Sequence, residues 1–146
     1  MRSDARGRNP GEPVRDYAAG QAADLLRRAT FHAGRVRKSQ HAGSIHDLRV
    51  AIRRLSQCLR VFDQFFPPGR LKKVRQKLKA CMDLASAVRD LDIALELLRR
   101  AALPPDSPLM LSLAEERAGS IQELVAELQL WVKKDVHRKW RSRLGL

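Results

Sequence analysis

The sequence predicts an all-α fold, an antiparallel up-and-down four-helix bundle, and three observations lead to this prediction. Apolar residues recur at helical spacing along four long segments, which short breaks rich in proline, glycine or polar residues separate. No segment has the alternating pattern of a convincing β-strand. The chain of 146 residues is long enough for one hydrophobic core but not for two. Short loops between long helices favour antiparallel neighbours, and three helices with a detached tail are the alternative.

The first helix is expected from about Val14 to Ser39. Its apolar and small residues fall at helical spacing: Val14, Tyr17, Ala18, Gln21, Ala22, Leu25, Ala29 and Val36. Residues 1–13 precede it and contain arginines without the hydrophobic stretch of a secretory signal. We therefore expect residues 1–13 to form a disordered basic tail and residues 14–146 to form the domain.

The second helix is expected from Ser44 to Phe62, after a break at residues 40–43. Ser44 has the side chain of an N-cap, and Asp47 follows at the spacing of a capping box. The helix should pack through an apolar stripe and end before the Phe66-Pro67-Pro68-Gly69 stop signal. That stripe consists of Leu48, Ala51, Ile52, Leu55, Leu59 and Phe62.

The third and fourth helices are expected from Arg70 to about Ala102 and from Ser107 towards Trp140. The third has core candidates at Leu71, Val74, Leu78, Cys81, Met82, Ala85 and Val88. The fourth begins with Ser107 as N-cap and Pro108 at the first helical position. Its core candidates are Leu113, Ile121, Leu124, Val125, Leu128, Trp131 and Val132. Cys58 and Cys81 occupy apolar positions, which predicts buried free thiols and fits a reducing compartment.

The charge of the chain is large and unevenly distributed. Twenty-nine Lys and Arg against sixteen Asp and Glu give a net charge of +13, which predicts an anionic partner such as nucleic acid, an anionic membrane or a soluble polyanion. Six basic residues lie within Arg70–Lys79 and six more within Lys133–Arg143, whereas residues 106–130 are acidic. No apolar run approaches the 18 residues of a membrane span.

A cationic stripe runs along the second helix. At about 100° per residue, His46, Arg49, Arg53 and Arg60 fall within roughly 60° of one another and about 140° from the apolar stripe. Arginine presents a planar fork that matches phosphate oxygens, so the stripe suits a long anion. An ordinary solvated basic face is the alternative interpretation.

A second polar motif lies on the third helix, at Val88-Arg89-Asp90-Leu91-Asp92-Ile93. Arg89 and Asp92 fall on the side of the core candidates, where a charged group needs a partner. They could pair with each other, as a structural ion pair that ties two helices together. Alternatively, Asp92 could orient Arg89, or an arginine of the second helix, towards a bound anion.

These two motifs, in this order, resemble the CHAD family, the conserved histidine α-helical domain. The resemblance rests on HDLRVAIRRL followed by LRVF (His46–Phe62), a Lys/Arg-rich helix, and RDLDI (Arg89–Ile93), and covers about Val14 to Leu130. Family members are all-helical and bind inorganic polyphosphate through a basic surface or channel. The resemblance implies an anion site lined by His46, Arg49, Arg53, Arg54 and Arg60, with Lys72, Arg75 and Lys79 as further candidates by position.

The chain also departs from the family pattern. A full CHAD domain has two related four-helix halves that face each other across a channel, and this sequence resembles the first half alone. We therefore expect a homodimer with two-fold symmetry that completes the channel. We expect no counterpart of the metal-dependent phosphatase domain that is often fused upstream in the family. The expected role is non-catalytic polyphosphate binding in the cytoplasm or at polyphosphate granules, with no cofactor and no metal site.

Two other functions remain open from the sequence. A nucleic-acid-binding domain would explain the charge, although few aromatic residues are available to stack on bases. A surface-binding module could instead place the Lys133–Arg143 run, with Trp131 and Trp140, on anionic lipid.

Overall fold

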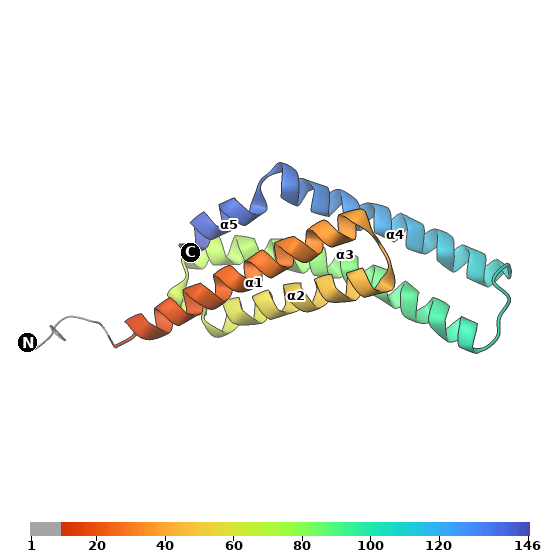
Figure 1. Cartoon of the computed structure of the whole chain (residues 1–146), viewed down its shortest axis with the longest axis horizontal. Helices are drawn as coiled ribbons and strands as arrows, with labels where there is room; N and C mark the ends of the chain where they lie inside the picture. Colours follow the sequence, from red (N-terminus) through yellow and green to blue (C-terminus); the bar gives the residue numbers. More distant parts are fainter. Residues whose placement is uncertain (1–9) are drawn as a thin grey trace, which may run out of the picture.

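Five α-helices and one short 3-10 helix make up residues 10–146, the part of the chain that the computed structural model describes (Figure 1). They are α1 (Glu12–Lys38), α2 (Ala42–Val61), η1 (Asp63–Phe65), α3 (Pro68–Arg100), α4 (Pro108–Lys133) and α5 (Val136–Leu144). The described residues contain no strand, and the all-α prediction is confirmed. Of the expected N-terminal tail, residues 1–9 lie outside the described part, while Glu12 and Pro13 already belong to α1.

The helices pack as two antiparallel hairpins with a shared core. α1 lies along α2, α3 lies along α4, and α2 joins the hairpins by packing against α3 (Figure 1). Every residue of the predicted apolar stripe on α2 is buried except Phe62, which is half-buried. On α3 the predicted core residues are also buried, with Met82 half-buried. α1 presents mainly alanines to the core, at Ala18, Ala22, Ala29 and Ala33, which allows its backbone to approach α2 closely.

The α1 stripe is rotated from the predicted one at its start. Val14 and Tyr17 are exposed, whereas Leu26 rather than Leu25 is fully buried. The Tyr17 ring meets Phe62 edge-on at a centroid separation of 6.0 Å, so it covers the end of the core from outside.

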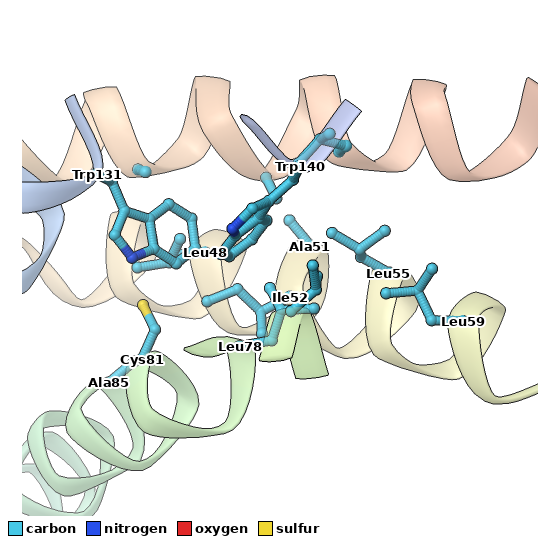
Figure 2. Close-up of a cluster of buried hydrophobic side chains, with 14 of the residues drawn as sticks. Leu48, Ala51, Ile52, Leu55, Leu59, Leu78, Cys81, Ala85, Trp131 and Trp140 are labelled. Atoms are coloured by element: carbon cyan, nitrogen blue, oxygen red, sulfur yellow. The ribbon is translucent and has the colours of Figure 1, made fainter. Parts of the chain in front are cut away.

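The fourth predicted helix is in fact two helices. Lys134 and Asp135 form a turn in which Asp135 adopts the left-handed conformation (φ 48°, ψ 58°), and α5 then folds back onto the bundle. Trp140 and Leu144 of α5 are buried, and the Trp140 ring meets Trp131 edge-on at 5.1 Å. Figure 2 shows both indoles inserted among core residues of α2 and α3. Burying a tryptophan is worth more than continuing the helix across one turn, because the side chain removes a large apolar area from water.

This arrangement argues against the lipid-binding alternative. Trp131 and Trp140 were the expected membrane anchors, and both are at most 5% exposed because they belong to the core. Within residues 10–146, no helix combines the length and apolarity that crossing a membrane requires.

The two predicted N-caps have different outcomes. Ser107 caps α4, with its hydroxyl accepting from the Met110 amide at 3.4 Å, as predicted. Ser44 does not cap α2, which begins two residues earlier. His41 is the N-cap, and its Nδ1 accepts from the Ser44 amide at 3.2 Å while Nε2 lies 3.0 Å from the Ser44 hydroxyl. The His41 imidazole thus satisfies one of the free amides in the first turn of α2.

The α3–α4 hairpin projects beyond the α1–α2 loop as an arm (Figure 1). Two of its large apolar residues, Leu95 and Met110, are buried apart from the main core, while Leu97, Leu109 and Leu111 are exposed. α3 ends there in a Schellman motif, in which the Leu103 amide donates to the Leu98 carbonyl and the Ala102 amide to the Arg99 carbonyl. Ala102 holds the left-handed position of this motif with φ 61°.

The two cysteines are free and buried, as predicted. Burial raises the pKa of the Cys58 thiol. Burial, with a smaller contribution from the nearby Glu127 carboxylate, raises the pKa of Cys81 to about 12. Both thiols are therefore protonated at neutral pH and are poor nucleophiles.

Candidate functional site

A groove of about 860 Å³ lies between α2 and the first half of α3, with η1 at one end. Its cations come in two rows, one from each helix. They are Arg53 and Arg60 on α2 and Lys72, Arg75 and Lys79 on α3. The apolar side chains of Leu71 and Met82 also line the groove, and Asp63 is its single carboxylate. Five cations less one carboxylate leave the groove lining with a charge of +4.

The helical geometry explains why these side chains gather. Arg53 and Arg60 are seven residues apart, which is two turns, so both project from the same face of α2. Lys72, Arg75 and Lys79 are related by three, four and seven residues on α3 and share a face in the same way. That face adjoins the buried stripe of Leu71, Val74 and Leu78, which fixes the rotation of α3 against α2.

Most of the groove cations are uncommitted. Within the described chain, no hydrogen bond or ion pair engages Arg53, Arg60, Lys72 or Arg75. Lys79 pairs with Asp83 at 2.9 Å, but both side chains are largely exposed. Such a surface pair is worth little, on the order of 0.5 kcal/mol, so Lys79 remains available to a stronger anion. Four of the five groove cations therefore have no protein acceptor within the described residues.

The remaining predicted residues of α2 lie elsewhere. His46 and Arg54 line a second pocket of about 420 Å³ on the other side of the helix, between α1 and α2. Arg53 lines both pockets, so it stands at the point where they meet. Arg49 lines neither pocket. It is half-buried and donates through Nε to the Ser86 hydroxyl at 3.3 Å, which joins α2 to α3.

Arg28 and His32 of α1 complete the second pocket, and neither was predicted from the sequence. Their spacing of four residues puts them on one face of α1, but α2 itself gives no indication of which α1 residues will lie beside it. Asp47, expected in a capping box, lines this pocket instead. The predicted single stripe is thus divided between two sides of α2, with Arg53 common to both.

Asp92 forms its ion pair with Arg117 of α4 and not with Arg89. Arg117 Nε lies 2.5 Å from Asp92 Oδ1, and Arg117 Nη2 donates to the Gln40 carbonyl at 2.7 Å. Arg89 is half-buried and, within residues 10–146, forms no hydrogen bond or ion pair with Asp92. Asp92 lies on the side of α3 that faces α4, so the arginine across the interface reaches it more readily. Arg117 thereby connects α3, α4 and the α1–α2 loop, and neither Asp92 nor Arg117 lines the groove.

The carboxylates of α4 do not approach the groove lining. Glu115, Glu116 and Glu123 are exposed, and Glu127 lines a separate pocket near α5. In residues 10–146, no group of three or more His, Cys, Asp or Glu side chains has an arrangement that could hold a metal ion. The charge asymmetry seen in the sequence is therefore a spatial asymmetry as well.

Comparison with known proteins identifies the family. The model of the CHAD domain matches residues 20–145, nearly the whole chain. Searches among curated proteins and among solved structures give no match. The matched range contains α2, α3 and both pockets. The chain therefore belongs to the CHAD-domain family, which is associated with polyphosphate binding and metabolism.

Proposed function

We propose that this protein binds inorganic polyphosphate, or a similar linear polyanion, in the α2–α3 groove and does not hydrolyse it. The observation that carries the proposal is the lining of five cations, four of which have no partner within the described residues. A phosphate chain has an anionic oxygen on every unit, so it can accept from both rows at once. Arginine donates in a bidentate fork and lysine acts as a point charge, and the groove offers both.

The length of the groove fits a chain of several phosphate units. From Lys72 to Lys79 the helix rises about 10 Å, and from Pro68 to Met82 about 21 Å, at 1.5 Å per residue. Release of counterions from the polyanion would supply much of the affinity, as it does for nucleic acids. The charge of +4 on the lining is the fixed part of this attraction.

Binding without hydrolysis is supported by the position of the acidic residues. Metal-assisted phosphate hydrolysis needs carboxylates that place the ion beside the scissile bond. Asp63 is the single carboxylate in the groove lining. Incubation with polyphosphate and Mg²⁺ or Mn²⁺ should release no phosphate above the buffer control, and turnover abolished by Asp63→Asn would overturn this part of the proposal.

Polyphosphate is favoured over nucleic acid by the absence of aromatic residues from the groove lining. Single-stranded nucleic acids gain much of their affinity by stacking bases on aromatic side chains. The groove lining has none, and the exposed aromatics Tyr17 and Phe31 are on α1. Polyphosphate should therefore displace a labelled polyphosphate probe at far lower concentration than DNA of equal charge. Equal competition would mean that the groove is a generic basic surface.

A titration of polyphosphate against wild type and a groove variant tests the site directly. Two charge-assisted hydrogen bonds are worth roughly 1.5–3 kcal/mol each, so Arg60→Gln/Arg75→Gln should weaken binding at least about 100-fold. The matched control is Arg27→Gln/Arg138→Gln, which removes the same net charge from exposed arginines outside both pockets. The control should bind within about threefold of wild type. Equal losses in the two variants would show that net charge, and not the groove, determines affinity.

We also propose that two copies of the protein pair with their grooves facing each other, so that the polyphosphate chain is enclosed between them. The groove is lined by α2, η1 and α3, and it is open to solvent. Two linings of +4 repel each other, so the dimer should form around the polyanion. Light scattering at micromolar protein should give the monomer mass alone and the dimer mass with polyphosphate. A monomer under both conditions would refute the dimer and leave the groove unaffected.

We place the protein in the cytoplasm, in association with polyphosphate granules. The support is the pair of buried free thiols, which suit a reducing compartment. Co-sedimentation with granules, lost in the Arg60→Gln/Arg75→Gln variant, is the expected result.

A further inference from the structure

The pocket between α1 and α2 concentrates nitrogen donors in half the volume of the groove. Three guanidinium groups and two imidazoles surround about 420 Å³, and they belong to Arg28, Arg53, Arg54, His32 and His46. The carboxylate of Asp47 also lines the pocket. With the imidazoles neutral, three arginines less one aspartate give the lining a charge of +2. A compact cluster suits a compact anion, whereas the two rows of the groove suit an extended one.

Most of these donors have no partner of their own. Within residues 10–146, Arg53, Arg54 and His46 form no hydrogen bond or ion pair. His32 is half-buried, and its Nδ1 is buried without a hydrogen-bond partner. A nitrogen so fully buried is out of reach of a ligand in the pocket, so His32 can contact one only through Nε2. Arg28 is held by Asp24 at 3.2 Å, in a pair that is partly exposed.

Arg53 connects this pocket with the groove, because it lines both. A polyphosphate chain that lies in the α2–α3 groove can therefore end at Arg53 and place its terminal phosphate in the α1–α2 pocket. Interior units of a linear polyphosphate have one ionisable oxygen, but the terminal unit has two. Like a phosphomonoester, it bears a charge of about −1.5 to −2 at pH 7. That charge matches the +2 of the pocket lining.

We propose that the α1–α2 pocket binds the terminal phosphate of a polyphosphate chain, so that the protein distinguishes chain ends from chain interiors. This inference rests on the proposed polyphosphate binding in the groove. The chemical feature recognised is a phosphate group with two ionisable oxygens, and such a group also occurs in inorganic phosphate and in phosphomonoesters. His32 and His46 donate to the second oxygen, while Arg28, Arg53 and Arg54 neutralise its charge.

The test compares two forms of a short polyphosphate of defined length. One form has free ends, and in the other both terminal phosphates are blocked as phosphoramidates, which leaves one ionisable oxygen on each. Wild type should bind the free-ended chain about tenfold more tightly, as the loss of one charge-assisted hydrogen bond predicts. His32→Gln/His46→Gln should bind both forms equally. Arg75→Gln, in the groove, should weaken both and keep the tenfold ratio.

Each outcome bears on one proposal. If wild type binds free and blocked chains equally, end recognition is wrong and the groove proposal stands; if it binds neither, the groove proposal fails. A ratio that persists in His32→Gln/His46→Gln would overturn the assignment to this pocket. Inorganic phosphate and glycerol phosphate are the comparison ligands, and either one binding as tightly as the free-ended chain would refute recognition of a chain end. Circular dichroism and thermal unfolding of each variant ensure that folded proteins are compared.

Discussion

Removing Arg117 should destabilise the fold much more than removing any surface arginine. Its side chain is 23% exposed and that of its partner Asp92 is 11% exposed. Arg117→Leu leaves the Asp92 carboxylate buried without a cation, and it also removes the donor to the Gln40 carbonyl. Asp92 Oδ2 already has no hydrogen-bond partner, so the variant leaves neither carboxylate oxygen bonded. Breaking a buried pair in this way costs about 3–5 kcal/mol.

The lower value applies here because Arg117 is partly in contact with solvent, so we expect a loss of about 3 kcal/mol in the free energy of unfolding. Urea denaturation measures it directly. With a slope of about 2 kcal/mol per molar urea, the midpoint should fall by about 1.5 M. The matched control is Arg100→Leu, which breaks the exposed pair with Glu96 at 3.2 Å. That variant should lose no more than about 0.5 kcal/mol.

The double variant Asp92→Leu/Arg117→Leu completes the cycle. Replacing both charges with apolar groups removes the uncompensated carboxylate, so the double variant should be more stable than Arg117→Leu alone. The coupling between the two sites should be about 2 kcal/mol or more. A loss below 1 kcal/mol in Arg117→Leu, indistinguishable from the Arg100 control, would refute the view that this buried pair holds α3 against α4 and positions Arg117 to bond the α1–α2 loop.

Three further results are expected. Because the groove has four to five effective cations, a plot of the logarithm of the polyphosphate association constant against the logarithm of salt concentration should have a slope of roughly −3. Titrations at several ionic strengths measure this slope. Arg75→Gln should reduce the magnitude of the slope by about 0.7, and Arg138→Gln should leave it unchanged. Ala102→Gly should raise the free energy of unfolding by about 0.5–1 kcal/mol, since Ala102 has φ 61°, whereas Ala101→Gly, at φ −78°, should lower it. The raised pKa of Cys81, about 12, means that its thiol stays protonated at pH 8, so iodoacetamide should label it in urea but not in the native protein; fast native labelling would contradict its burial.

The features that depend on one helix were predictable from sequence. Helix positions on α2 and α3 followed from apolar spacing, and the cationic face of α2 followed from its angles alone. The groove brings Arg53 and Arg60 of α2 together with Lys72, Arg75 and Lys79 of α3, and the cationic face of each helix could be read from that helix alone. The spacing of residues within one helix determines which of its side chains share a face, and the neighbouring helices do not change this.

The features that depend on packing between helices were not predictable. Helical spacing continues from Trp131 to Trp140, and only the gain from burying Trp140 against Trp131 explains the turn at Asp135. In the same way, the partner of Asp92 depends on α4, and the separation of His46 from Arg60 depends on α1 lying along one side of α2. A helical wheel gives the direction of each side chain but not the neighbour it meets.

The arm formed by the ends of α3 and α4 has a practical consequence for surface attachment. Its connecting loop, residues 101–107, lies at the opposite end of the molecule from the groove (Figure 1). Pro104, Pro105 and Asp106 in this loop are exposed, and the Ser107 cap and the Schellman motif stabilise the helix ends on either side. A fluorophore or biotin placed there would tether the protein with both pockets facing the solution. The fold thus provides an attachment point for binding assays that test the proposed function.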